Sequence, residues 1–249
     1  MHRSLSRWLR PAASDDTLQL QGAMAQRLAQ LRPFPEPGEQ LLATQPLLVF
    51  DLETSGLDLK HDQVLSGGAV HIENMAIILG KTYERILNVD TRLQADSQLF
   101  HGLTADDLRH GTDPRVALLE LLEQGQNAIW LAWQGWFDQH MLHKGAQHWL
   151  GMTTAQLPQV VDLALIMPAL FPALAQPNAD LDDWLRYLGL SNAMRHHATA
   201  DAMVTAELTL ICLHQAQTQG VQTWGELAVL AAREKKIREQ RGQALWPGF

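Results

Sequence analysis

Two acidic side chains, Asp51 and Glu53, stand one residue apart at the end of the apolar run 47–50, "LLVF". Side chains alternate between the two faces of a strand, so both carboxylates should point to the same side, roughly 6.6 Å apart. At an effective dielectric constant near 20, two negative charges at that distance repel each other by about 2 to 3 kcal/mol. A purely structural site gains nothing from this repulsion, so we expect a cation between them. The alternative is a strand end that turns into solvent.

Two further acids occupy comparable positions. Asp138 lies in "WFDQHML", just after the predicted strand 127–133, and Asp201 lies in "HHATADA". Acids placed where strands end and helices begin fall on the rim of an α/β sheet, where sites are usually built. A carboxylate cluster without cysteine favours Mg²⁺ or Mn²⁺ over zinc. Two such ions about 3.5 to 4 Å apart clamp the reacting oxygens of an in-line displacement at phosphorus.

Simpler interpretations exist for several of these acids. Asp138 and Asp201 could be first-turn helix acids that are favoured by the helix dipole. Asp162, His101 and Asp180 are interpreted as caps or packing residues and are left outside the predicted site.

The acids need a scaffold that brings them together. The pattern predicts an α/β domain with a mixed central sheet, made of a three-strand meander followed by further strands and flanked by helices. The first three strands are predicted from residue 47, at 64–72 and at 75–87, with a hairpin turn at 73–74. The predicted helices cover 103–108, 113–125, 136–149, 160–171, 180–188, 199–218 and 223–241.

Helical extensions are predicted on both sides of a catalytic domain at residues 45–215. Residues 1–44 contain a predicted helix at 15–31 and the proline-rich linker "RPFPEPG". Residues 216–249 form a helical tail, whose basic stretch 233–241 is interpreted as a solvated face. These extensions could dock a polymerase, another partner or a second copy of the chain, and the sequence does not choose among them.

The composition is that of an ordinary globular protein without a membrane span. The chain has 249 residues, 46% of them hydrophobic, and a net charge of −8, which argues against coating nucleic acid through a broad basic surface. The longest apolar region, 160–175, is interrupted by Asp162, Pro168 and Pro172, and no apolar segment follows the basic N-terminus as in a secretory signal. Cys212 is interpreted as a core residue in a reducing compartment. The expected location is cytoplasmic.

Three segments carry a resemblance to a known family. In order and separation, "VFDLETSGLD", "WFDQHML" and "HHATADA" resemble the three motifs of the DEDDh 3′–5′ exonucleases, typified by the proofreading epsilon subunit of bacterial DNA polymerase III. The looser run "FHGLTADDL" is also similar, and the resemblance covers about residues 45–215. It implies a ribonuclease H-like fold and a site with two ions, Mg²⁺ or Mn²⁺. By motif, the metal ligands are Asp51, Glu53, Asp138 and Asp201, and His196 is the general base.

The resemblance is incomplete at one loop and ambiguous at one histidine. Trp133-Gln134 replaces the His-Asn pair common in relatives, which leaves the substrate contacts of this loop open. Within a helix, His197 would stack under Asp201, whereas His196 would point about 140° away. The family spacing therefore requires His196 to lie on a loop before a helix that begins near residue 198 or 199. Trp130, Trp133 and Trp136 could stack bases, although core packing is favoured for Trp130.

The function implied by the resemblance is that of a 3′–5′ exonuclease releasing nucleoside monophosphates from single-stranded 3′ ends, in proofreading or repair. DNA is favoured over RNA as substrate. An RNA 3′ exonuclease of the same superfamily is one alternative. The other is a non-catalytic module that binds nucleic acid or a polymerase; such a module predicts damage to the acid set, which is complete here.

Overall fold

The computed structural model describes residues 15–91, 101–176, 179–192 and 194–241, with side chains from residue 22 onward. The chain divides into two compact units, residues 1–31 and residues 32–249. The first unit contains the helix α1 (Asp15–Gln30), which confirms the helix predicted at 15–31. All other elements belong to the second unit.

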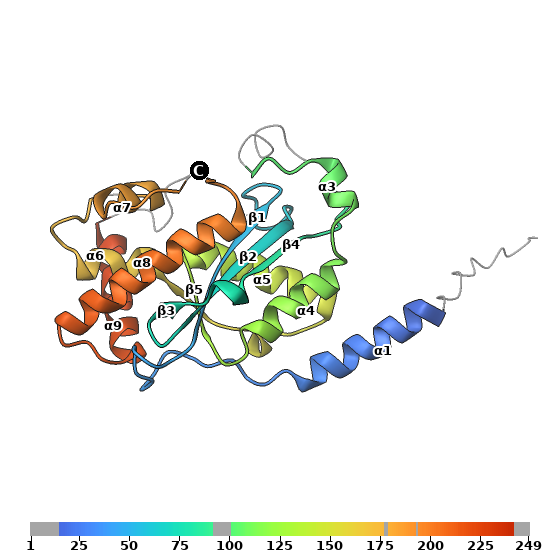
Figure 1. Cartoon of the computed structure of the whole chain (residues 1–249), viewed down its shortest axis with the longest axis horizontal. Coiled ribbons are helices and arrows are strands. Elements are labelled where there is room, and N and C mark those ends of the chain that lie inside the picture. Colours follow the sequence, from blue (N-terminus) through green and yellow to red (C-terminus); the bar gives the residue numbers. More distant parts are fainter. Residues whose placement is uncertain (1–14, 92–100, 177–178, 193, 242–249) are drawn as a thin grey trace, which may run out of the picture. The chain divides into compact units, whose positions relative to one another are not determined.

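A mixed sheet forms the centre of the second unit (Figure 1). Its strand order is β3-β2-β1-β5-β6, and β4 also pairs with β2. β1 lies antiparallel to β2 and parallel to β5, and β5 lies parallel to β6. The strands are β1 (Leu47–Thr54), β2 (Val64–Glu73), β3 (Ala76–Ile77), β4 (Tyr83–Ile86), β5 (Ile129–Ala132) and β6 (Val160–Asp162). The predicted meander followed by further strands is confirmed.

Two predicted elements are divided differently in the structure. The single strand predicted at 75–87 becomes β3, a 3₁₀ turn (η1, Leu79–Lys81) and β4, because its first part pairs with the end of β2 and its last part with the middle of β2. The helix predicted from residue 160 starts with a strand instead. The valines of β6 pair with β5, and the Asp162 carboxylate then accepts a hydrogen bond from the Ala164 N–H (3.0 Å), which caps the helix α6 (Leu163–Leu170).

The two faces of the sheet are covered by different helices. α8 (Ala198–Thr218) packs over β1 and β2, and Val49 of β1 belongs to the same core cluster as α8. The next residue, Phe50, points the other way and packs edge-to-face against Trp130, with the ring centroids 5.1 Å apart. The Trp130 indole donates a hydrogen bond to the carbonyl of Gly125, at the end of α4 (Pro114–Gln124). α4 in turn packs on α5 (Gly135–Leu150).

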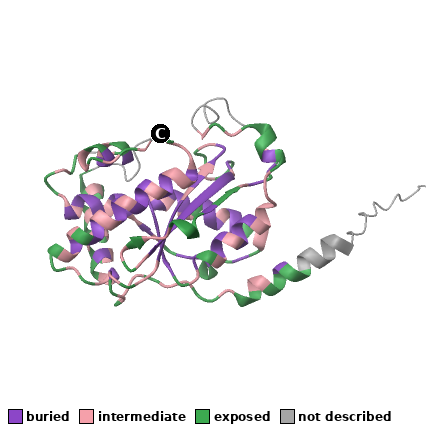
Figure 2. Ribbon diagram, in the orientation of Figure 1, coloured by how far each residue is buried: buried purple, intermediate pink, exposed green. Residues whose placement is uncertain are grey.

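The remaining helices complete the second unit. α6 packs on both α8 and α9, and the core runs along the strands and the inner sides of the helices (Figure 2). Among the described residues, no helix combines the length and apolar content needed to cross a bilayer. These helices are α3 (Ala105–Arg109), α6 (Leu163–Leu170), α7 (Leu181–Tyr187) and α9 (Trp224–Gln240).

Candidate active site

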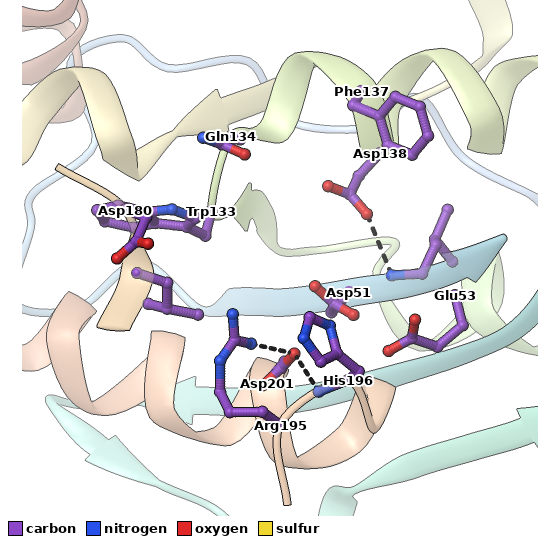
Figure 3. Close-up of a pocket in the computed structure, with 12 residues that line it drawn as sticks. Asp51, Glu53, Trp133, Gln134, Phe137, Asp138, Asp180, Arg195, His196 and Asp201 are labelled. Carbon is purple, nitrogen blue, oxygen red and sulfur yellow. Dashed lines mark hydrogen bonds and ion pairs between the residues drawn. The ribbon is translucent and has the colours of Figure 1, made fainter. Parts of the chain in front are cut away.

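A cavity of about 250 Å³ lies at the end of β1 (Figure 3). Its walls come from β1, the start of α5, the start of α7 and the loop before α8. All five predicted site residues line it: Asp51, Glu53, Asp138, His196 and Asp201. Trp133, Gln134, Asp180 and Arg195 also contribute to its lining.

Asp51, Glu53 and Asp201 are brought together by a close approach of α8 to the sheet. Asp51 lies opposite Gly68 in the β1–β2 register. A Cβ atom on Gly68 would overlap the backbone of Ala198 and Thr199, so only glycine lets the first turn of α8 lie so close to β2. That turn carries Asp201, and one oxygen from each of the three carboxylates lies within 4.8 Å of the others.

Too little positive charge surrounds Asp51 and Glu53 to balance their carboxylates. Burial raises the pKa of Asp51 well above its usual range, and Asp138, Glu53 and Asp201 raise it further. Burial, with a contribution from Asp201, raises the pKa of Glu53 to about 7. Among the described residues, no group donates a hydrogen bond to either carboxylate. Hard oxygen atoms that are close together and without other partners suit a divalent cation.

Asp201 is held differently, by partners that lie just before it in the chain. Its carboxylate pairs with the Arg195 guanidinium and accepts hydrogen bonds from the Asn192 amide and from the His196 N–H (3.1 Å). Arg195 also forms an ion pair with Asp182 of α7, with 2.7 Å between its Nε and the Asp182 Oδ1. Arg195 lowers the pKa of both Asp51 and Glu53. The chain itself thus supplies part of the positive charge that the acid pair requires.

Asp138 lies near the other three acids but outside their closely spaced group. It is in the first turn of α5, 5% exposed, and its Oδ1 accepts a hydrogen bond from the Leu52 N–H at 3.1 Å. Figure 3 shows Asp138 and Asp201 on either side of β1. Burial raises the pKa of Asp138 well above its usual range, and the bond from Leu52 opposes that shift.

The position of Asp138 depends on how α5 begins. Gln134 precedes the helix in a left-handed conformation, with φ of 54°. The buried carboxylate of Asp162 accepts backbone hydrogen bonds from Gln134, Gly135 and Ala164, and burial raises its pKa to about 6. Asp162 is therefore a cap, as predicted, and it also ties the start of α5 to the end of β6.

The two adjacent histidines have separate environments. His196 has φ of 61° and precedes α8, which begins at Ala198, so the loop placement required by the motif spacing is confirmed. In Figure 3 its ring lies among Asp51, Glu53 and Asp201. His197 is the residue before α8, and its Nε2 pairs with Glu84 of β4 at 3.1 Å.

Several residues near the site carry roles that the sequence pattern did not show. Arg195 and Asn192 were missed, although an arginine directly before the His-x-Ala-x-x-Asp run was a usable signal. Asp180 caps α7 by accepting from the Asp183 N–H (2.8 Å), as predicted, and it also lines the cavity. His101 lies outside the lining; burial and the neighbouring His196 lower its pKa. Trp130 is fully buried, which confirms its core interpretation.

The sequence model of the RNase T family, described as exonuclease, matches residues 48–209. That span is well over half of the 249 residues and includes all five predicted site residues. The chain belongs to the RNase T exonuclease family. It is therefore a nuclease, related to proteins of the DNA polymerase III group, as the three motifs predicted.

Two relatives illustrate that relation. The chain is 26% identical over 193 residues to the PolC-type DNA polymerase III of Caldanaerobacter subterraneus subsp. tengcongensis, covering 77% of this chain and 13% of the relative. It is 28% identical over 214 residues to a DNA polymerase III subunit epsilon-like protein of Rhodobacter capsulatus, covering 82% of this chain and 29% of the relative. The chain thus spans less than a third of either relative.

Solved structures confirm the ribonuclease H-like fold. Escherichia coli exonuclease I in complex with a dT13 oligonucleotide superposes with a TM-score of 0.60 at 17% identity, covering 71% of this chain and 42% of that one. Cell-death related nuclease 4 gives a TM-score of 0.55 at 14% identity, covering 72% of this chain and 66% of that one.

Proposed function

We propose that this exonuclease hydrolyses phosphodiester bonds at the 3′ ends of single-stranded DNA and releases nucleoside monophosphates. The observation that carries the proposal is the group of three carboxylate oxygens within 4.8 Å of one another, with His196 in the same cavity. A binding module would have no use for Asp51 and Glu53, whose pKa values are raised by burial and by their acidic neighbours.

The acid group suits divalent cations, and we assign Mg²⁺ or Mn²⁺ to it. Asp51, Glu53 and Asp201 would hold the cations, and Asp138 would complete the ligand set from the opposite side of β1. Cations held by these carboxylates would supply activation of the attacking water and charge stabilisation at the leaving 3′ oxygen. The oxygen-only donor set and the lack of cysteine support this choice over softer metals.

His196 is assigned as the general base. Its loop position places the imidazole in the cavity beside the acids, where it accepts the proton of the attacking water. Its backbone N–H, bonded to the Asp201 carboxylate, fixes the loop against the first turn of α8. His197 has no such role, because its ring pairs with Glu84.

The choice of single-stranded DNA is supported by two comparisons. The fold matches that of exonuclease I, which was solved with a dT13 oligonucleotide, and the sequence relatives are DNA polymerase III proteins. The same relation supports a role in proofreading or repair, and a polymerase or another protein is the proposed partner of the terminal extensions. The cytoplasmic location remains the expectation from the sequence composition. The RNA exonuclease is kept as an outcome of the test below.

The test is a digest of matched DNA and RNA oligonucleotides, labelled at either the 3′ or the 5′ end, with Mg²⁺, Mn²⁺ or EDTA. We expect early release of label from 3′-labelled DNA, a shortening ladder from 5′-labelled DNA, and no reaction in EDTA. Faster digestion of RNA than of DNA would show that the protein is an RNA 3′ exonuclease instead. Activity that survives chelation, or equal cleavage of circular single-stranded DNA, would contradict the mechanism.

A further inference from the structure

A row of four side chains follows the outer side of α5, starting beside the active-site cavity. Trp136, His140, Lys144 and His148 are spaced four residues apart, which places them along one face of the helix. We call this row the α5 stripe. Over the 12 residues from its first member to its last it is about 18 Å long, which is enough for several nucleotides of a single strand.

The α5 stripe borders two cavities that the catalytic residues do not line. One has a volume of about 480 Å³ and includes Trp136, His140 and Lys60 in its walls. The other, of about 230 Å³, includes Lys60, His61 and His148. The loop between β1 and β2 forms the opposite wall of both. The stripe and this loop together make a hollowed surface beside the site.

Lys144 fixes the loop to α5. Its ammonium group donates hydrogen bonds to the carbonyl oxygens of Leu59 (2.9 Å), Lys60 (2.9 Å) and Asp62 (2.6 Å). Three backbone acceptors hold this side chain in one place, so the wall that carries Lys60 is built in advance of any ligand. The side chain of Lys60 itself is exposed.

The charge of this surface contrasts with the charge of the whole chain, which is −8. Among the described residues that line the two cavities, Asp62 is the only acid. Its carboxylate is buried and accepts hydrogen bonds from the Ser55 hydroxyl and the Asp58 N–H. Asp58 lies within the same loop, and its carboxylate pairs with His61 at 2.8 Å. The exposed side chains of Lys60, His140 and His148 and the half-buried ring of Trp136 therefore line this surface, a combination suited to a polyanion with flat bases.

The α5 stripe is continuous with the active site. Trp136 contacts Phe137 edge-to-face with ring centroids 5.9 Å apart, and Phe137 and Asp138 line the catalytic cavity. A strand whose end lies at the acids can thus continue along α5 without leaving the protein surface.

We propose that the α5 stripe and Lys60 bind the single-stranded segment that precedes the terminal nucleotide of the substrate. Trp136 stacks against a base, Lys60 pairs with a backbone phosphate, and His140 lies between them as a hydrogen-bonding group. This inference rests on the proposed function, since it assigns the site of the rest of the same substrate. The residues of the α5 stripe take no part in the hydrolytic step itself.

The test compares substrates of different length. We would measure kcat/KM for thymidine oligonucleotides of two, four and twelve nucleotides with wild type, Trp136→Ala and Lys60→Ala. For Trp136→Ala, loss of one stacked base predicts a decrease of about 5- to 100-fold on the twelve-nucleotide substrate and a much smaller one on the dinucleotide. For Lys60→Ala, loss of one phosphate contact lowers the slope of log(kcat/KM) against log[salt] by about 0.7 on the longest substrate.

Controls separate binding from folding. Trp136→Phe should restore most of the length dependence, because phenylalanine keeps a stacking face. Lys81→Ala removes a lysine that pairs with Glu73 near β3, and should leave the salt slope unchanged. Equal losses of Trp136→Ala on all three lengths would overturn the proposal and assign Trp136 a purely structural role in α5.

Binding decides the question independently of hydrolysis. We would measure the anisotropy of a labelled twelve-nucleotide strand with Ca²⁺ in place of Mg²⁺. Weaker binding by Trp136→Ala and Lys60→Ala than by Lys81→Ala supports the stripe, and equal binding by all of them overturns it. If wild type binds the strand through the stripe but digests no oligonucleotide, the proposed function fails and the strand-binding surface stands.

Discussion

Asp62, which is buried in the loop after β1, and Asp51, which is half-buried within β1, have surroundings that differ in kind. Asp62 is 7% exposed and accepts hydrogen bonds from the Ser55 hydroxyl at 2.7 Å and the Asp58 N–H at 2.8 Å. A Cβ on Gly56 would lie 2.5 Å from its Oδ2, so the turn after β1 is shaped around this side chain. Asp51 has three other acids around it, and no donor to its carboxylate among the described residues.

The contrast separates a carboxylate that stabilises a loop from one that needs a ligand. Neutral donors supply the hydrogen bonds of Asp62, so its burial is compensated within the protein. The charges around Asp51 repel one another, and only Arg195 opposes them. Removing Asp62 should therefore cost stability, whereas removing Asp51 should cost activity.

The largest expected effect is that of Asp51→Asn. This change removes one ligand of the proposed cations, and we expect kcat to fall by about 10³-fold or more. The melting temperature of the metal-free protein should stay the same or rise, because one source of repulsion is gone. Steady-state kinetics and calorimetry on the same preparation check both parts. A large drop in melting temperature would instead assign Asp51 the structural role that we give to Asp62.

The second effect concerns the general base. His196→Ala should lower kcat by about 10²- to 10⁴-fold with metal binding largely kept, because proton transfer is lost while the acids remain. His197→Ala should cost less than about tenfold, since its ring pairs with Glu84 outside the cavity. Single-turnover rates measure the chemical step directly. Equal losses or the reverse order would show that the base is assigned to the wrong histidine.

The third effect concerns the glycine under α8. Gly68→Ala should push the first turn of α8 away from β2, because the new methyl group meets backbone atoms that cannot rotate aside. A shift of about 1 Å at Asp201 would lower kcat by roughly 10²-fold. Gly67→Ala is the matched control: its methyl would lie 3.1 Å from a side-chain carbon of Leu52, rather than overlap backbone atoms, and should cost much less. Similar activity in the two variants would contradict this role for Gly68.

The fourth effect is on stability. Asp62→Ala leaves the Ser55 hydroxyl and the Asp58 N–H without their acceptor, which should destabilise the fold by about 1 to 3 kcal/mol. For a chain of this size, we expect the melting temperature to fall by several degrees. Differential scanning calorimetry of Asp62→Ala beside Asp51→Asn checks the contrast. An unchanged melting temperature in Asp62→Ala would remove the basis for treating the two acids differently.

The smallest effect is the pH dependence of Glu53→Gln without metal. The pKa of Glu53 is raised from 4.5 to about 7, so the stability it contributes is present below pH 4.5 and lost as the pH rises through 7. Glutamine has no such loss. The melting temperature of the variant minus that of wild type should therefore increase as the pH rises from about 5 to about 8. A difference that is constant with pH would show that Glu53 is already charged in the folded protein.

Local sequence patterns predicted most of the site. That Asp51 and Glu53 share one side follows from strand alternation alone. His196 is assigned through the resemblance of its motif to the exonuclease family, because helix geometry alone would favour His197. The α/β order of elements was likewise visible in the periodicity, from β1 through α8.

The remaining features depend on contacts between distant segments. The split of residues 75–87 is set by their pairing with two different parts of β2. The role of Gly68 arises because Thr199, far along the chain, lies over it. The pairing of Arg195 with both Asp182 and Asp201 depends on where α7 packs. Spacing along one strand or helix carries no information about such distances.

The measurement that tests the central claim most directly is titration of the metal-free protein with Mn²⁺ by calorimetry near pH 7, in two buffers of different ionisation enthalpy. The account predicts that wild type binds Mn²⁺ and releases protons, because acids with raised pKa values must lose protons to coordinate a cation. Asp51→Asn should bind much more weakly, and Asp62→Asn should bind like wild type. Equal binding by wild type and Asp51→Asn, or binding by wild type without proton release, would contradict the account.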